Sequence, residues 1–186
     1  MANKRNRVCP VENADSLDTR IRRWIQNPRR ILSPYIQEGM TVMDFGCGPG
    51  YFTVDMAKLV GKTGHVFAVD LQDGMLEKLK SKILDTDVED IITLHKCEDK
   101  RIGLDAQLDF VLVFYVLHEL PDPSGFLAEL ASMLKADSQV LVVEPPFHVS
   151  KTDFLKIVQM AGQNGFTPVK VSRMRFNKTL VLRKER

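Results

Sequence analysis

The chain has 186 residues, of which 44 % are hydrophobic and 27 % charged, and these values predict a single globular domain with one well-buried core. No run of about 18 apolar residues occurs, so we expect no membrane span, and the basic first residues lead into no apolar segment, which argues against secretion. The three cysteines form no C-x-x-C pair, so we expect neither a disulfide framework nor a metal site. Free cysteines are typical of a reducing compartment, so we expect a cytoplasmic location.

The formal net charge of +2 is distributed unevenly. Residues 1–35 hold eight Lys and Arg against three Asp and Glu, and the tail after Val169 is basic again. Such basic edges bind an anionic substrate, RNA or a membrane surface in some proteins, and in others they are a solvated surface.

Residues 1–39 read as an N-terminal helical segment that precedes the first strand. Apolar residues recur at intervals of three and four over 16–26, which predicts an amphipathic helix. Asn27 followed by Pro28 is typical of an N-cap and a first-turn proline. This pair predicts a second helix that continues through Ile36 and stops at the next glycine.

The stretch Thr41–Phe52 combines a strand, a tight turn and the start of a helix. Apolar residues lead into Asp44, the turn holds glycines at 46, 48 and 50, and a helical pattern follows at once. Glycines leave room for a ligand against the main chain, and the helix presents unpaired N–H groups and a partial positive charge to the same place. We therefore expect a ligand with a negative end at this turn.

The spacing of the glycines narrows the range of ligands that we expect at this turn. A dinucleotide-binding turn reads G-x-G-x-x-G, whereas here the third glycine comes one residue early and Asp44 stands two positions before the first. This D-x-G-x-G-x-G form resembles motif I of the class I S-adenosylmethionine-dependent methyltransferases. In that family the turn packs against the methionine part of the cofactor and the acidic residue orients it around the amino group. The N-terminal helices of that family often cover the acceptor pocket, whereas Trp24 in this chain could equally pack on the core.

His65–Asp70 is a short apolar run that predicts a buried parallel strand ending in a carboxylate. The two oxygens of Asp70 can accept both hydroxyl protons of a ribose, which suits NAD and S-adenosylmethionine alike. A helix-capping acid is the alternative. Leu71 and Met75 are placed to touch the adenine face, although Met75 could instead belong to the core.

A helix from Asp73 to about Leu84 and a third strand over Ile91–Lys96 come next, followed by Cys97-Glu98-Asp99. The family usually has a small acidic motif here that contacts the adenine amino group. This sequence departs from the usual Gly-Asp-Ala form, so Cys97, Glu98 or main-chain atoms are the candidates for the adenine contact.

Leu108–Phe114 predicts a fourth strand. The segment from Phe114 to Leu120, Phe-Tyr-Val-Leu-His-Glu-Leu, resembles the corresponding stretch of methyltransferases in the ubiquinone/menaquinone group. The resemblance implies that Phe114 and Tyr115 lie beside the methyl-bearing sulfur and that His118 faces the acceptor. A histidine there can take a proton as the methyl group is transferred. The alternative is a histidine that only shapes the pocket.

The last third of the chain completes the pattern of an α/β sheet. Glu144 ends the fifth strand, and His148 lies in the proline-rich loop after it, where it is a second candidate for substrate contact. The predicted elements are a capped helix from Asp122-Pro123 to Leu134, a strand over Val140–Glu144, a helix opened by Ser150–Asp153 and ended by Gly165, and a hairpin over 166–175 and 179–182.

These elements predict a doubly wound, Rossmann-like α/β fold with helices on both faces of the sheet. The resemblance implies seven strands in the order 3-2-1-4-5-7-6, with strand 7 antiparallel, and a methyltransferase domain over 40–186. It also implies S-adenosyl-L-methionine as the cofactor. The residues expected to bind it are Asp44, Gly46, Cys47, Gly48, Gly50, Asp70, Leu71, Met75, Cys97, Glu98 and Phe114.

We therefore expect a methyltransferase acting on a small-molecule acceptor, with Tyr115 and His118 as candidate catalytic residues. One alternative is an RNA or protein methyltransferase that uses the basic edges, so nucleic acid is a less favoured partner. Another is a domain that binds the cofactor without catalysis. A nicotinamide oxidoreductase is disfavoured by the glycine spacing and by Asp44.

Overall fold

The computed structural model describes residue 11 and residues 26–174 and 177–185, with the side chains of 171–174 left out. The helix expected over 16–26 therefore falls almost wholly outside the described residues. The elements are α2 (Pro28–Leu32), β1 (Thr41–Phe45), α3 (Thr53–Val60), β2 (His65–Asp70), α4 (Asp73–Ile83), η3 (Glu89–Ile91), β3 (Ile92–Lys96), β4 (Leu108–Phe114), η4 (Leu117–Glu119), α5 (Pro123–Met133), β5 (Leu134–Glu144), α6 (Lys151–Gln163), β6 (Phe166–Met174) and β7 (Asn177–Lys184).

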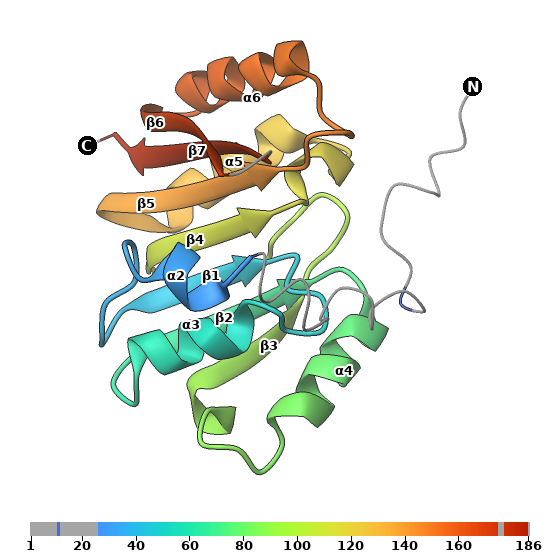
Figure 1. Ribbon diagram of the computed structural model, residues 1–186, viewed down its shortest axis with the longest axis vertical. Coiled ribbons are helices and arrows are strands. Elements are labelled where there is room, and N and C mark those ends of the chain that lie inside the picture. The colour runs from blue at the N-terminus through green and yellow to red at the C-terminus, as the bar shows by residue number, and fades with distance from the viewer. Residues whose placement is uncertain (1–10, 12–25, 175–176, 186) are drawn as a thin grey trace.

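The strands form one seven-stranded sheet in the order β3-β2-β1-β4-β5-β7-β6. Neighbouring strands from β3 to β5 are parallel, and β7 runs antiparallel to both β5 and β6. Figure 1 shows this succession from β3 at one end of the molecule to β6 at the other. The predicted fold class, strand order and antiparallel seventh strand are confirmed.

Helices cover both faces of the sheet because the central strands are apolar on both sides. Along β4, Phe110 and Leu112 belong to the core shared with α2, α3 and α4, whereas Val111 and Val113 belong to the core shared with α5 and α6. Successive side chains of a strand point to opposite faces, so one continuous apolar run serves two cores. All four of these β4 residues are fully buried.

Helix α2 is shorter than predicted. The side chain of Asn27 accepts a hydrogen bond from the Arg30 amide at 3.0 Å, so the predicted cap and first-turn proline are confirmed. The helix ends at Leu32 instead of continuing through Ile36. Pro34 explains the early end, because it has no N–H to donate to the carbonyl four residues earlier and its ring clashes with that turn.

Strand β5 is longer than predicted, since it begins at Leu134 instead of Val140. Its polar first half is held against β4 by side chains. The Ser138 hydroxyl donates to the Leu108 carbonyl at 2.8 Å, and the Lys135 ammonium pairs with the Asp109 carboxylate at 2.7 Å. A hydrophobic pattern cannot reveal a strand that is fixed in this way. Strand β3 begins at Ile92, one residue later than predicted, because Ile91 belongs to η3.

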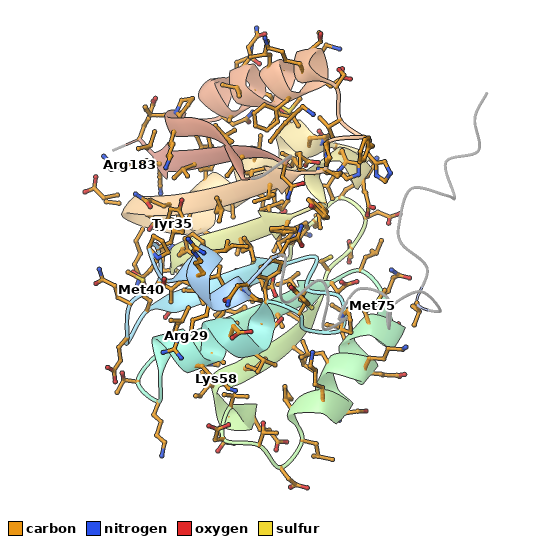
Figure 2. All side chains as sticks on the ribbon, in the orientation of Figure 1. Arg29, Tyr35, Met40, Lys58, Met75 and Arg183 are labelled. Atoms are coloured by element: carbon orange, nitrogen blue, oxygen red, sulfur yellow. The ribbon has the colours of Figure 1, made fainter. Side chains whose placement is uncertain are left out.

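The parallel strands end at one edge of the sheet, and the loops that follow them gather there. In Figure 1 the arrowheads of β4 and β5 point to the same side of the molecule, and Figure 2 shows Met75 on that side, at the start of α4. In a doubly wound sheet this is the edge where ligands bind, at the point where the strand order reverses between β1 and β4. None of the helices in the described part of the chain has the length and apolar character needed to cross a membrane.

Candidate active site

A cavity of about 810 Å³ opens at the carboxyl edge of the sheet. Its lining comes from the glycine turn after β1, the ends of β2 and β4, the segment after β3, η4, and the loop after β5. It includes all but one of the residues predicted to bind the cofactor, together with Tyr115, His118 and His148. Segments far apart in the sequence therefore meet at one place.

Gly50 is the predicted site residue that the cavity lining does not include. A Cβ atom at Gly50 would lie 2.3 Å from Cδ1 of Leu79 in α4, so this glycine lets the turn pack against a helix. Gly46 does line the cavity, and a Cβ atom there would lie 2.2 Å from Cγ2 of Val116. Both glycines have positive φ, 72° at Gly46 and 79° at Gly50, a region that other residues rarely adopt.

The Asp70 carboxylate joins the ends of β1 and β2. Its Oδ2 accepts from the amide of Gly48 and its Oδ1 from the amide of Gln72, both at 2.9 Å. Burial raises the pKa of this carboxyl group, and these backbone N–H groups act in the opposite direction. Each oxygen keeps a second lone pair, so the carboxylate can still accept the hydroxyl protons of a bound ribose. Gln72 is the N-cap of α4, so Asp70 braces the turn before that helix and is not its cap.

The Asp44 carboxylate lies beneath the glycine turn. It is 2 % exposed, and its Oδ2 accepts from the Thr53 hydroxyl at 2.6 Å. Burial raises the pKa of Asp44 to about 7, and the hydrogen bond from Thr53 opposes this shift while the nearby Asp70 charge adds to it. A cationic group bound above the turn would favour the ionised form of Asp44.

The segment after β3 forms a further part of the cavity wall. Cys97, Glu98 and Asp99 all line the cavity, as do Leu71 and Met75. The Cys97 amide donates to the Asp70 carbonyl at 3.0 Å, which holds this segment beside the end of β2. Burial raises the pKa of the Cys97 thiol to about 11, so the thiol is neutral near pH 7.

Aromatic rings form another part of the cavity wall. The ring of Phe114 lies with its centroid 4.5 Å from that of Phe52 and 4.4 Å from that of Tyr115. Tyr115 has a φ of 65°, a strained backbone for a residue with a side chain. Its hydroxyl donates to Oδ1 of Asn177 at 2.8 Å and accepts from Nε2 of Gln26 at 2.9 Å.

His118 and Glu144 form a hydrogen-bonded pair next to these rings. Nδ1 of His118 lies 2.6 Å from Oε2 of Glu144, which is fully buried. The hydrogen bond that Nδ1 of His118 donates to the Glu144 carboxylate raises the pKa of His118, against the opposing effect of burial. Glu119 lies close by, and burial raises its pKa to about 7. The ring of His148 lies 5.7 Å from that of His118.

The loop after β5 borders the cavity with Pro145, Pro146, Phe147 and His148. The Lys178 ammonium of β7 donates to the carbonyls of Val149 at 2.6 Å and Pro146 at 3.4 Å, which ties the loop to the hairpin. The Phe147 side chain is 94 % exposed. An exposed aromatic ring at the mouth of a largely apolar cavity is suited to contact an apolar ligand.

Several residues of this site were not predicted from the sequence. Gln26 connects two of its aromatic residues, because its carbonyl accepts from the Tyr51 hydroxyl at 2.7 Å and its amide donates to Tyr115. Asn177 lies between the two strands of the predicted hairpin, whereas in the structure it begins β7 and lines the cavity. Glu144 carried one usable signal, since it is an acid at the end of an apolar strand.

The residues that line the cavity have the chemistry needed to bind S-adenosylmethionine. The turn at Gly46 has room for a main-chain contact that a side chain would block, and Asp44 lies next to it for a cationic amino group. Asp70 offers a ribose partner, and the apolar side chains of Leu71 and Met75 stand beside it. No Lys or Arg occurs among the described lining residues, whereas five carboxylic acids do, which suits a ligand that carries a sulfonium cation.

A family model described as a methyltransferase domain matches residues 36–175. The chain belongs to the methyltransferase domain family. The match begins before β1 and ends after β6, so it contains the whole parallel part of the sheet. The class I resemblance drawn from the D-x-G-x-G-x-G turn is confirmed, and S-adenosylmethionine is the cofactor with which this family transfers methyl groups.

Relatives of this methyltransferase domain include two bacterial enzymes. The demethylmenaquinone methyltransferase of Halalkalibacterium halodurans is 31 % identical over 109 residues, which are 59 % of this chain and 44 % of that protein. The demethylmenaquinone methyltransferase of Bacillus subtilis is 28 % identical over 123 residues, which are 66 % of this chain and 52 % of that protein. The chain thus spans about half the length of the curated relatives it matches.

Solved structures share the fold of this methyltransferase domain. A S-adenosylmethionine-dependent methyltransferase from Aquifex aeolicus has a TM-score of 0.86 at 24 % identity, over 95 % of this chain and 100 % of that one. A putative rRNA methylase from Clostridium thermocellum has a TM-score of 0.70 at 22 % identity, over 86 % of this chain and 94 % of that one. At these identities the likeness shows the fold.

Proposed function

We propose that the chain is a methyltransferase that transfers the methyl group of S-adenosylmethionine to a small-molecule acceptor. The observation that carries this proposal is the continuity of the cavity. The glycine turn, Asp70, Tyr115, His118 and His148 all line one cavity. We call the part beside the glycine turn and Asp70 the cofactor end, and the part beside Tyr115, His118 and His148 the acceptor end. A cofactor bound at the glycine turn would share this cavity with the acceptor.

The cofactor end is built to bind and orient. Asp44 and the turn through Gly46 and Gly48 would hold the amino-acid part, and Asp70 would hold the ribose. Bound S-adenosylmethionine supplies an electrophilic methyl group, so the protein has to position the acceptor in line with it and exclude water. Leu71, Met75, Cys97, Glu98 and Phe114 complete this end, while Gly50 supports it from behind.

The acceptor end supports a small organic substrate over a nucleic acid. Its described walls are aromatic rings, prolines and two histidines, with no Lys or Arg to meet phosphate groups. The curated relatives are named for demethylmenaquinone, a small molecule with an apolar body. The Lys and Arg residues that the structure describes lie outside the cavity lining, and we read them as solvated surface.

We propose a division into an N-terminal cap segment, residues 1–39, and a methyltransferase domain, residues 40–186; of the first segment the structure describes residue 11 and residues 26–39. Gln26 supports this division, because it is hydrogen-bonded to Tyr51 of the glycine turn and to Tyr115 after β4. A cytoplasmic location stays a prediction from the sequence.

Isothermal titration calorimetry with three ligands tests the proposed function. We expect micromolar affinity for S-adenosylmethionine and S-adenosylhomocysteine, about −8 kcal/mol, and no binding of NAD. The test of catalysis adds labelled S-adenosylmethionine and a panel of aromatic hydroxyl compounds. Binding of NAD in preference to the sulfonium compound would reject the proposal, and binding without transfer to any small molecule, but with transfer to RNA, would assign the site to nucleic acid.

A further inference from the structure

The fully buried carboxyl group of Glu144 has one engaged oxygen and one unengaged oxygen. Its Oε2 lies 2.6 Å from Nδ1 of His118, while its Oε1 has no hydrogen-bond partner among the described residues. A buried polar atom without a partner destabilises a fold, so such groups are retained mainly where they have another role. Glu144 therefore calls for an explanation beyond packing.

The pair is held by two neighbouring strands. Glu144 ends β5, and His118 lies in η4, just after β4. Phe114 at the end of β4 is paired in register with Val143 of β5, so the ladder itself brings the two side chains together. His118 lines the cavity and Glu144 does not, so the carboxyl group approaches the ring from behind the cavity wall.

We propose that Glu144 is a positioning residue that keeps the neutral ring of His118 protonated on Nδ1, so that Nε2 can accept a proton from a hydroxyl group of the methyl acceptor. This inference rests on the proposed function and deepens it. It assigns the acceptor to the class of hydroxyl compounds that have an apolar or aromatic body, because the adjacent walls are Phe114, Tyr115 and the prolines of the 145–148 loop.

The proton and electron balance of the step is complete. The O–H bond of the acceptor breaks and its proton goes to the Nε2 lone pair of His118, which becomes an imidazolium. The oxygen electron pair forms the new bond to the methyl carbon, and the electron pair of the broken carbon–sulfur bond stays on sulfur. The positive charge of the sulfonium thus passes to His118, next to the carboxyl group that stabilises it.

The charged groups around His118 favour transfer of the proton from the acceptor to the ring. Glu144 faces the ring from β5, Glu119 lies beside it in η4, and His148 lies opposite in the loop after β5. Glu119 also acts to raise the pKa of His118, and Asp70 acts on Glu119 across the cavity. Within the described residues, no group of three or more His, Cys, Asp or Glu side chains is arranged to hold a metal ion.

A different proton position would reverse the role of the pair. If the carboxyl group of Glu144 kept the shared proton, it would donate to Nδ1 and the neutral ring would carry its own proton on Nε2. That nitrogen could then donate to an acceptor but could not take a proton from it. The two arrangements place the heavy atoms alike and differ in one measurable property, the tautomer of His118.

The test is a two-bond ¹H–¹⁵N correlation spectrum of the full chain labelled at histidine, recorded over pH with and without S-adenosylhomocysteine. His118→Gln identifies the signals of His118. We expect the Nδ1-protonated tautomer at high pH in the unmodified protein. In Glu144→Gln that preference should be lost and the titration of His118 should move to lower pH, and Glu144→Asp should restore both in part.

Glu119→Gln is the matched control, because it removes a nearby acid that does not hydrogen-bond the ring. It should lower the titration midpoint of His118 and leave the tautomer unchanged. An Nε2-protonated ring in the unmodified protein would overturn the inference. This measurement does not depend on whether any of the variants folds. Calorimetry with S-adenosylhomocysteine on the same samples separates the two proposals, because absent binding would reject the proposed function whatever the tautomer.

Discussion

The Oδ2 atom of Asp70 accepts a hydrogen bond from the amide of Gly48 at 2.9 Å. This bond joins the end of β2 to the glycine turn after β1, which are the two parts of the site expected to hold the ribose and the amino-acid tail of one cofactor. The same carboxylate fixes the loop before α4 through the Gln72 amide. Asp70 is thus both a candidate ligand and the group that shapes the turn before the ligand arrives.

Replacing Asp70 by Asn should weaken S-adenosylhomocysteine binding at least tenfold, about 1.4 kcal/mol, because a carboxylate accepts both ribose hydroxyls and an amide accepts through one oxygen only. Asp73→Asn is the matched control. Asp73 begins α4, directly after the loop that follows Asp70, and pairs with Lys96 at the surface, outside the cavity lining. Calorimetry of both variants gives the comparison, and equal affinity of Asp70→Asn and the unmodified protein would remove Asp70 from the site.

Cofactor binding should release a proton near pH 6.5. Burial raises the pKa of Asp44 to about 7, so the carboxyl group is largely protonated at that pH, and a cationic amino group beside it would favour ionisation. Affinity should therefore rise as the pH is raised through 7. Calorimetry in two buffers of different ionisation enthalpy measures the released proton. Identical enthalpies in both buffers would show that the amino group does not meet Asp44.

Gly46→Ala should abolish measurable cofactor binding. The new Cβ would lie 2.2 Å from the Val116 side chain at a φ of 72°, so the turn or η4 must shift. Gly162→Ala is the opposite case, since nothing lies within 4 Å of its added Cβ in helix α6. That variant should bind normally and gain about 0.5–1 kcal/mol of unfolding free energy. Urea unfolding measures the stability of both variants, and calorimetry measures their cofactor affinity. Together they separate strain at the glycine turn from the effect that any Gly→Ala replacement has on stability.

Tyr115→Phe should lower the stability of the fold by about 1 kcal/mol, a decrease in Tm of about 2–4 °C. The loss follows because Asn177 and Gln26 both lose a partner when the hydroxyl is removed. Tyr35→Phe is the control, because that ring stacks on Phe110 at 5.6 Å and keeps this contact without its hydroxyl. Scanning calorimetry tests the difference. A Tyr115→Phe protein as stable as the control would mean that the hydroxyl serves the reaction and not the fold.

The fold could be read from the sequence because its signals are local. The strands His65–Asp70 and Leu108–Phe114 have the predicted bounds, since each is a short, nearly continuous apolar run. The caps at Asn27 and Asp122 were predicted for the same reason, and each accepts the expected backbone N–H. The early end of α2 was also encoded, by a proline within the predicted helix.

The sequence indicated site residues at strand ends and in the glycine turn, such as Asp44 and Asp70, because the topology of the sheet fixes where strand ends meet. Tyr115 and His118 were predicted from the resemblance of the segment after β4. Gln26 and Asn177 were missed because their contacts with Tyr115 join segments separated by 89 and 62 positions in sequence. Nothing local in the sequence indicates such contacts. The packing role of Gly50 against α4 depends likewise on where a distant helix lies.

The most direct test of the central claim is a crystal structure of the protein with S-adenosylhomocysteine. We predict that the ribose hydroxyls lie within hydrogen-bond distance of Asp70, that the amino-acid tail lies against the turn at Gly46 and Gly48, and that the sulfur points toward Phe114 and Tyr115. A ligand bound outside this cavity, or one whose ribose makes no contact with Asp70, would contradict the account.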